Sequence, residues 1–448
     1  FECPQHNFEE MYYYRWWSLR KHIKETPVGY GMTEFLVQRS YSDKYNLIAC
    51  AIGHHIYESR WLRDPKYLDQ IIHTWYRGND GGPMKKMDKF SSWNADAVLA
   101  RYMVDGDKDF MLDMTKDLET EYQRWERTNR LKNGLYWQGD VQDGMEESIS
   151  GGRKKKYARP TINSYMYGNA KALSIMGILS GDEGMAMRYG MRAATLKSLV
   201  ENDLWNTRHQ FFETMRSDSS ANVREAIGYI PWYFNLPDTT KKYEVAWKEI
   251  MDEKGFSAPY GLTTAERRHP EFRTRGVGKC EWDGAIWPFA SAQTLTAMAN
   301  FMNNYPQTVL SDSVYFRQME LYVESQYHRG RPYIGEYLDE VTGYWLKGDQ
   351  ERSRYYNHST FNDLMITGLI GLRPRLDDTI EINPLIPADK WDWFCLDNVL
   401  YHGHNLTILW DKNGDRYHCG KGLRIFVNGK EAGHADTLTR LVCENALK

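Results

Sequence analysis

The chain has 448 residues, which is enough for one large domain with a small one, or for three domains of ordinary size. Its 57 Lys and Arg residues nearly balance 60 Asp and Glu residues, and a net charge of -3 excludes the strongly basic surface that holds a nucleic-acid backbone. No stretch of about 18 apolar residues occurs, so we expect no membrane-spanning segment.

Aromatic residues make up 14% of the chain, with 16 Trp and 31 Tyr. Their rings can stack on the C–H face of a sugar while Trp and Tyr hydrogen-bond its hydroxyl groups. The same residues could instead fill a large helical core. Composition alone leaves both interpretations open.

The cysteines are scattered without the C-x-x-C spacing of zinc or redox sites, so we expect no metal and no other cofactor. Their disulfide pairing and the oligomeric state of the protein stay open. The chain begins with Phe1 instead of Met, which indicates that a leader or upstream region has been removed and favours export to the periplasm or the extracellular space. The six cysteines are Cys3, Cys50, Cys280, Cys395, Cys419 and Cys443.

From about residue 8 to residue 372 the pattern is mostly helical, with apolar positions three and four apart and short turns between segments. The order of helix, short turn, helix and longer aromatic-rich loop is the one that a closed ring of αα-hairpins requires. We therefore expect a mainly α fold, an (α/α)6 barrel over 1–372. The predicted helices are 44–60, 65–76, 93–104, 107–127, 163–179, 184–203, 238–252, 286–303 and 312–327.

After residue 372 the sequence changes to short alternating runs at 379–382, 405–410 and 422–427, separated by turn signals. Three prolines, Pro374, Pro384 and Pro387, mark the junction. Residues 373–448 are therefore predicted to form a small antiparallel β module.

Three loops interrupt the helical pattern with carboxylates among Gly and aromatic residues. Cleavage of a glycosidic bond normally needs two carboxyl groups, and loops at one rim of a scaffold are where such sites are assembled. The loop 134–152 contains four carboxylates, the loop 333–345 contains Glu336 between a Gly and a Tyr, and 280–288 combines two carboxylates with two Trp. An exposed acidic surface and helix capping by Asp283 are the alternative interpretations.

Four blocks in this order resemble a known clan of enzymes, the six-hairpin glycosidases, which includes trehalases, processing α-glucosidases and mannosylglycerate hydrolases. Residues 143–148, Asp-Gly-Met-Glu-Glu-Ser, are similar to the block that carries the general acid. Residues 160–165 end in Asn-Ser-Tyr and look like an Asn-x-Tyr block. Residues 282–288 resemble Trp-Arg-Gly-Pro-x-Trp-Pro, and 336–343 are similar to the Glu-x-Tyr-x-x-x-Thr-Gly block that supplies the base.

The resemblance implies an inverting glycoside hydrolase in which Glu146 is the acid and Glu336 is the base. Glu146 stands where better-known members have Asp, so Asp143 and Glu147 remain alternatives for the acid. Asp283 replaces the usual Arg. The sugar stays open among α-glucosides, α-mannosides and plant side chains such as a β-L-arabinofuranoside.

Aromatic and polar residues of the same rim are expected to bind the carbohydrate substrate. The N-terminal run 12–17 and the segment 53–64 look like parts of this rim, although plain packing would also explain them. His54 and the adjacent His55 cannot share a helix face as metal ligands do. The expected binding residues are Trp93, Asn94, Trp137, Asn163, Tyr165, Trp282, Asp283, Trp287, His54 and Arg60.

Two other functions remain possible. A disaccharide phosphorylase on the same barrel would use phosphate in place of water, which leaves the base unnecessary, so Glu336 favours hydrolysis. A non-catalytic glycan-binding protein would keep the aromatic rim and lack the acid.

Overall fold

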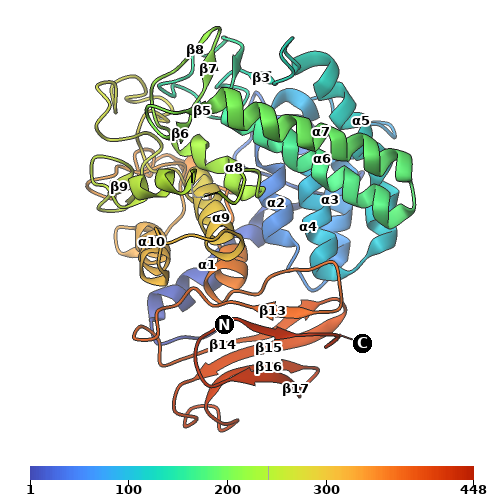
Figure 1. The fold of residues 1–448 in the computed structure, drawn as a ribbon, viewed down its shortest axis with the longest axis vertical. Helices are drawn as coiled ribbons and strands as arrows, with labels where there is room; N and C mark the ends of the chain where they lie inside the picture. Colours follow the sequence, from blue (N-terminus) through green and yellow to red (C-terminus); the bar gives the residue numbers. More distant parts are fainter. Residues whose placement is uncertain (241, 448) are drawn as a thin grey trace.

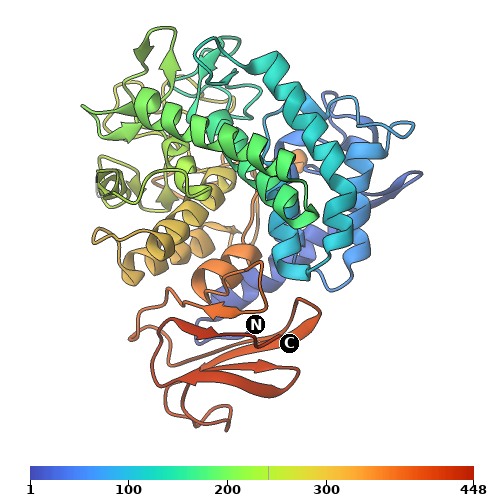
Figure 2. The same ribbon diagram turned by 45° about the vertical axis from the view of Figure 1, so that its right-hand side comes forward.

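A computed structural model describes residues 1–240 and 242–447. It is rich in helices and carries a small antiparallel sheet near the C-terminus, as the sequence predicted at this coarse level. Figures 1 and 2 show the helices gathered above and the C-terminal strands layered below them. No helix among the described residues combines the length and apolar character that crossing a membrane requires.

The helices follow the predicted order along most of the chain, and their bounds agree within a few residues with seven of the predicted segments. They are α1 (His6–His22), α2 (Ile52–Ser59), α3 (Pro65–Arg77), α4 (Asn94–Asp105), α5 (Lys108–Asn129), α6 (Pro160–Ser180), α7 (Glu183–Leu199), α8 (Ile230–Tyr233), α9 (Pro288–Asn304), α10 (Asp312–Ser325) and α11 (Asn362–Leu364), the last continuing as a π-helical turn over Met365–Leu369.

Two helical hairpins owe their sharp turns to a Gly-Asp pair. Gly106 ends α4 with φ 74°, and Asp107 then caps α5 by accepting a hydrogen bond from the backbone N–H of Phe110 at 3.0 Å. Gly181 ends α6 with φ 79°, and Asp182 caps α7 in the same way. Gly tolerates the left-handed conformation and Asp satisfies a free N–H group, so each pair stops one helix and starts the next.

Two predicted helices are wrong in extent. Only Ile52–Ser59 of the segment 44–60 is α-helical, after two short 3₁₀ turns. The segment 238–252 contains only a 3₁₀ helix at Glu244–Ile250, and its residue 241 lies outside the described part of the chain. Between α7 and α9 the chain runs mostly through loops and two-residue strands, which pack Phe211, Tyr229 and other large aromatic residues into the core.

Contacts among the helices form a closed circuit. α2 packs on α4, α4 on α6, α6 on α8, α8 on α9, α9 on α11, and α11 again on α2. α3, α5, α7 and α10 each pack against a member of this circuit, and α1 packs against α10 and α11. The residues between the ends of these helices form long loops, which build the site described below.

The C-terminal sheet has the antiparallel order β14-β15-β16-β17, with β14 (Trp393–Tyr401), β15 (His404–Asp411), β16 (Gly422–Val427) and β17 (Lys430–Ala435). β13 (Ile380–Ile382) pairs separately with β18 (Leu441–Cys443). The sheet contacts the helices through His402, whose backbone N–H donates to the carbonyl of Val104 at 2.7 Å, and through Trp391, which packs on Phe8.

Short antiparallel strands pair with one another within the loops of the helical part. They are β1 (Ile23–Thr26) with β2 (Gly29–Met32), the sheet of β3 (Trp137–Gln138), β4 (Tyr157–Ala158), β7 (Met215–Arg216) and β8 (Ser219–Ser220), and the pairs β5 (Trp205–Asn206) with β6 (Phe211–Phe212), β9 (Ser257–Ala258) with β10 (Gly261–Leu262) and β11 (Tyr327–His328) with β12 (Arg331–Pro332).

Candidate active site

The three loops singled out in the sequence meet at one cavity of about 340 Å³. Glu146 comes from the first loop, Glu336 from the second, and Cys280 and Trp287 from the third. A further acid, Glu34, reaches the same cavity from the segment after β2. The structure therefore brings three carboxyl groups to one cavity.

The loop around Glu146 is held in a fixed turn. Gly144 has φ 73°, and a Cβ atom at this position would collide with the Sγ atom of Cys50. The backbone N–H of Met145 closes the turn by donating to the carbonyl of Asp140 at 2.8 Å. The adjacent Glu147 adopts a left-handed conformation and pairs with Arg153 instead of lining the cavity.

Burial raises the pKa of Glu146 to about 7, and the negative charge of Glu336 acts in the same direction. Desolvation disfavours the charged form of a carboxyl group, as does a like charge nearby. Glu146 can therefore hold a proton near neutral pH, which is the state that a general acid needs.

Glu336 differs from Glu146 in having cations beside it. Its Oε2 atom lies 3.4 Å from the Arg352 guanidinium and 3.8 Å from the Lys347 ammonium group. The carboxylate is buried, and the same Oε2 atom accepts no hydrogen bond from any described residue. Glu336 therefore lies beside two positively charged groups, whereas Glu146 forms no ion pair with any described residue.

Glu34 was not predicted from the sequence. The Tyr356 hydroxyl donates a hydrogen bond to its Oε1 atom at 2.5 Å, while burial raises the pKa of Glu34 to about 8 and the charges of Glu336 and Glu146 add to this. Nothing in its local sequence marks Glu34, because it follows a short strand that is far from the three loops in the chain.

Asp143 lies three residues before Glu146 but has a different environment. Its carboxylate forms a buried ion pair with Arg159 at 2.6 Å and accepts hydrogen bonds from the hydroxyl groups of Ser91 and Thr161. It does not line the cavity. These contacts tie the loop to the start of α6.

The Trp residues expected on one wall are only partly brought together. Trp287 lines the cavity and stacks between Trp282 and Tyr337, with ring centroids 4.5 Å from each. Trp282 is buried behind it. Trp137 is half-buried with the Lys156 ammonium 4.3 Å from its ring, and it does not line the cavity.

The structure corrects the expectation that Trp93 binds the substrate. It is 0% exposed and packs on Tyr165 and His54, with centroid distances of 4.8 and 5.0 Å. Its position at the start of α4 suggested a rim residue, but the side chain turns into the core. The N-terminal run 12–17 also lies away from the cavity, on α1.

The remaining expected binding residues are buried and support the backbone or each other. Asn163 bonds both the N–H and the carbonyl of Tyr136, at 2.8 and 2.9 Å. Asp283 accepts from the backbone N–H groups of Arg275 and Gly276. None of these residues lines the cavity. Asn94 donates a hydrogen bond to Glu121, Arg60 donates one to Asp363, and the Tyr165 hydroxyl accepts one from Gln293. His54 packs between the rings of Trp93 and Phe289.

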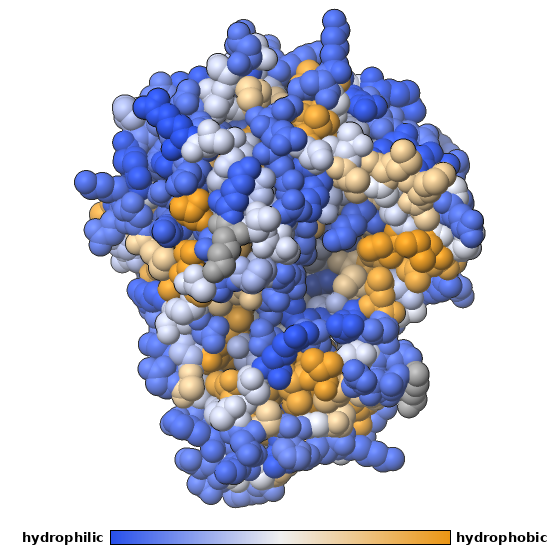
Figure 3. All heavy atoms as spheres, in the orientation of Figure 1, coloured by the Kyte–Doolittle hydropathy of each residue, from blue (hydrophilic) through white to orange (hydrophobic). Residues whose placement is uncertain are grey.

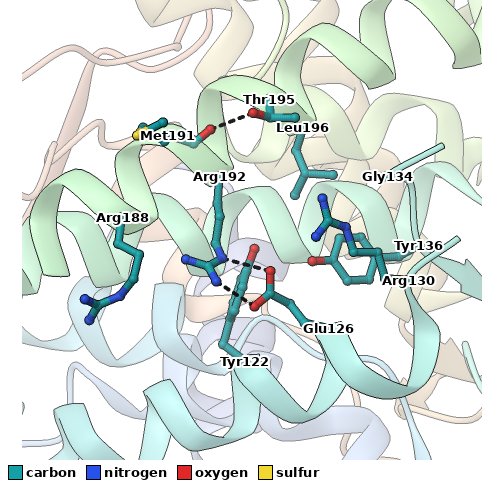
Figure 4. A pocket seen from close by; sticks show the side chains of 10 residues that line it. All are labelled: Tyr122, Glu126, Arg130, Gly134, Tyr136, Arg188, Met191, Arg192, Thr195 and Leu196. Carbon is teal, nitrogen blue, oxygen red and sulfur yellow. Dashed lines mark hydrogen bonds and ion pairs between the residues drawn. The ribbon is translucent and has the colours of Figure 1, made fainter. Parts of the chain in front are cut away.

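A second hollow, between α5 and α7, does not offer the same chemistry. Figure 4 shows its lining, with Glu126 facing Arg192. This carboxylate is the only one among the lining residues, and Arg192 binds both of its oxygens at 2.8 and 3.0 Å. The described residues also contain no group of three His, Cys, Asp or Glu side chains placed to hold a metal ion, and all six cysteines are free.

Comparison with known proteins agrees with a carbohydrate-cleaving site. Residues 44–359 match the family described as mannosylglycerate hydrolase MGH1-like glycoside hydrolase domain, and residues 372–434 match the C-terminal domain of glycosyl hydrolase family 65. The first match covers more than half of the chain. The protein is therefore a glycoside hydrolase.

Within that class the chain belongs to the MGH1-like glycoside hydrolase family, in the six-hairpin glycosidase clan that the sequence blocks resembled.

Solved structures share the fold. One protein named "Sialidase" is 99% identical with a TM-score of 0.99, and it covers the whole of this chain, which spans 41% of that longer protein. The GH63 mannosylglycerate hydrolase from Thermus thermophilus in complex with glucose is 13% identical with a TM-score of 0.59, over 80% of this chain and 99% of that one. A GH78 family rhamnosidase of Bacillus sp. GL1 is 12% identical with a TM-score of 0.60, over 95% of this chain and 41% of that one.

Proposed function

We propose that the chain hydrolyses a glycosidic bond with inversion of the anomeric centre, on an (α/α)6 barrel over residues 1–372 followed by a β module over 373–448. The closed circuit from α2 through α4, α6, α8, α9 and α11 supports the barrel as its inner ring. The change from helices to strands after α11 supports the division into two domains.

In this mechanism Glu146 donates its proton to the leaving oxygen while Glu336 removes a proton from the attacking water. The single observation that carries the assignment is that both acids line one cavity but only Glu336 lies beside two cations, whereas burial raises the pKa of Glu146, which forms no ion pair with any described residue. Two carboxyl groups whose environments differ in this way are typical of an acid and a base at work together. Asp143 is a positioning residue, because its ion pair with Arg159 leaves it no access to substrate.

The substrate we propose is a neutral sugar at the end of a chain. The volume of about 340 Å³ is at the small end of ligand cavities, which suits a terminal residue and one neighbour. Arg352, one of the cations that line the cavity, already pairs with Glu336 at 3.4 Å. It is therefore not free to hold the carboxylate of an acidic sugar such as a sialic acid, and we do not extend the name of the longer relative to this cavity.

A phosphorylase is the second candidate, since Lys89 and Arg352 line the cavity and could hold phosphate. The position of Glu336 beside Arg352 disfavours it, because phosphate bound there would be repelled by the carboxylate. Phosphate dependence of the reaction, with a sugar phosphate as product, would replace the hydrolase proposal.

The test is a panel of aryl glycosides and plant oligosaccharides, including a sialoside, followed by proton NMR of the first product. We expect hydrolysis of a neutral glycoside without added phosphate, and the anomer formed first to be opposite to that of the substrate. A product with the substrate's configuration would mean that Glu336 attacks the sugar directly, which contradicts inversion. Cleavage of the sialoside alone would contradict the neutral substrate.

A further inference from the structure

Another cavity lies on the far side of the central helices from the candidate active site. Its volume is about 380 Å³, and its lining comes from residues 96–103 of α4 and the C-terminal halves of α2, α6 and α9, together with α8, α11 and the chain that leads into β13. Figure 3 shows a hollow on this face between the helical part and the sheet below. We call this space the lower cavity.

The lower cavity is separate from the catalytic one and shares no lining residue with it. Tyr233 lines the lower cavity and lies 5.8 Å from Trp93, which in turn lies 6.4 Å from Phe289 on the wall of the catalytic cavity. A layer of buried aromatic rings therefore divides the two, and the chemistry of each can be considered alone.

The acids of the lower cavity already have partners. Asp363 pairs with the Arg60 guanidinium at 2.8 Å and accepts from Trp61 Nε1 at 2.7 Å. Asp96 accepts from the Tyr57 hydroxyl at 2.6 Å. The last acid is satisfied in the same manner, since Glu381 pairs with Arg375 at 2.8 Å and Arg440 at 2.9 Å.

Two cations of the same cavity lack such partners. The Arg373 guanidinium donates to the Asn300 side-chain oxygen at 3.0 Å and to the Thr367 carbonyl at 3.5 Å, but forms no ion pair with any described residue. Lys171 likewise has no ion-pair partner within the part of the chain that the structure describes. Burial lowers the pKa of Arg373, although Glu381 nearby opposes this effect.

Arg373 is half-buried and Lys171 is exposed, and both are available to a negatively charged ligand because no carboxylate of the described residues pairs with them. The Tyr233 hydroxyl also lines this space, whereas the Thr296 hydroxyl donates to the Ala292 carbonyl and the Asn304 amide donates to Asn235. The guanidinium fork of Arg373 matches the oxygen atoms of a carboxylate, phosphate or sulfate group.

We propose that the lower cavity binds a small oxyanion, with Arg373 and Lys171 as its charged ligands. The anion lies between the central helices and the segment that joins them to the sheet, so its binding stabilises the junction of the two parts. Its source is either a free inorganic anion or the carboxylate of an acidic sugar, and the two are distinguished by the probes below.

The experiment measures binding to the intact chain by equilibrium dialysis and thermal unfolding, with inorganic phosphate, sulfate and galacturonate each compared with chloride at equal ionic strength. We expect saturable binding at one site and a rise in the unfolding temperature, because a ligand that binds only the folded state stabilises it. Preference for phosphate or sulfate identifies a free anion, and preference for galacturonate identifies an acidic sugar.

The variants locate the site. Arg373→Met should weaken binding roughly 10- to 100-fold, the loss expected when a hydrogen-bonded charge is removed. Lys171→Met, at an exposed position, should weaken it less, and Lys116→Met on the outer face of α5 should bind as the parent does. Absence of saturable binding by all three anions would overturn the proposal, as would equal binding by the parent and Lys171→Met.

Discussion

The loop that carries Glu146 and the loop that carries Glu336 reach the same cavity from different parts of the chain, yet their carboxyl groups have different charged neighbours. Glu336 lies beside Arg352 and Lys347, whereas Glu146 forms no ion pair with any described residue and burial raises its pKa to about 7. The comparison shows that the role of a carboxyl group follows from the charges that other segments bring to it. The predictions below test that contrast.

The largest effect is expected from Glu336→Gln. Removing the group that activates water should lower kcat/KM by roughly 10²- to 10⁴-fold or more on every substrate, because base catalysis does not depend on the leaving group. Steady-state kinetics on one activated and one poor substrate measure this. Glu351→Gln, an exposed acid on the same segment, is the control and should keep parental activity. A loss confined to poor leaving groups would assign Glu336 the acid's role.

Asp143→Asn tests whether the neighbour of Glu146 is structural. It leaves the buried Arg159 without its charged partner, and we expect the free energy of unfolding to fall by about 3–5 kcal/mol. Chemical denaturation measures it, with the exposed Asp378→Asn as a control that should stay within about 0.5 kcal/mol of the parent. Full stability of Asp143→Asn with a leaving-group-dependent loss of rate would make Asp143 the acid instead.

The protonated acids of the cavity predict how stability depends on pH. The pKa values of Glu34 and Glu146 are raised to about 8 and about 7, so the folded protein holds protons that the unfolded chain releases near pH 4.5. Stability should therefore fall as the pH rises from about 4.5 to 8, by roughly 1.4 kcal/mol for each unit by which a pKa is raised. Glu34→Gln should flatten this slope in denaturation curves, and an unchanged slope would mean that Glu34 is ionised in the fold.

The smallest expected effect is on KM, and it distinguishes Trp287 from Trp137, two residues that the sequence predicted to line the same cavity wall. Trp287→Ala should raise KM about 2- to 10-fold, the range expected for loss of aromatic contact, because Trp287 lines the cavity. Trp137→Ala should leave KM unchanged, since its ring lies under Lys156 away from that space. Equal effects would indicate that the binding surface extends beyond the cavity.

The sequence was most informative where structure is local. The Gly-Asp pairs at 106–107 and 181–182 stop and start helices by their own backbone preferences, so these hairpins could be predicted. The helix predicted at 238–252 was wrong in extent, because the helical spacing of the buried residues Ala246, Trp247 and Ile250 belongs to a short 3₁₀ helix at Glu244–Ile250. The aromatic core of the segment between α7 and α9 is not local. Phe211, Tyr229 and Phe256 meet in the core from separate turns.

Within the site, loop composition together with the resemblance to the six-hairpin glycosidases pointed to Glu146 and Glu336, and the structure brings both to one cavity. Glu34 was not predicted from the sequence, because only the folded chain places it beside Tyr356. Asn163 and Asp283 looked like sugar ligands, but their hydrogen bonds go to backbone groups that hold the loops in place. A polar residue in a motif can therefore serve the shape of a site without touching its ligand.

The most direct test of the account is the leaving-group dependence of Glu146→Gln. If Glu146 is the acid, kcat/KM should fall greatly for an alkyl or natural glycoside that needs protonation, and much less for a glycosyl fluoride or an activated aryl glycoside that does not. Rates on the two classes of substrate, compared with those of the parent, decide it. An equal loss on both, or no loss on either, would contradict the assignment of the proton donor to Glu146.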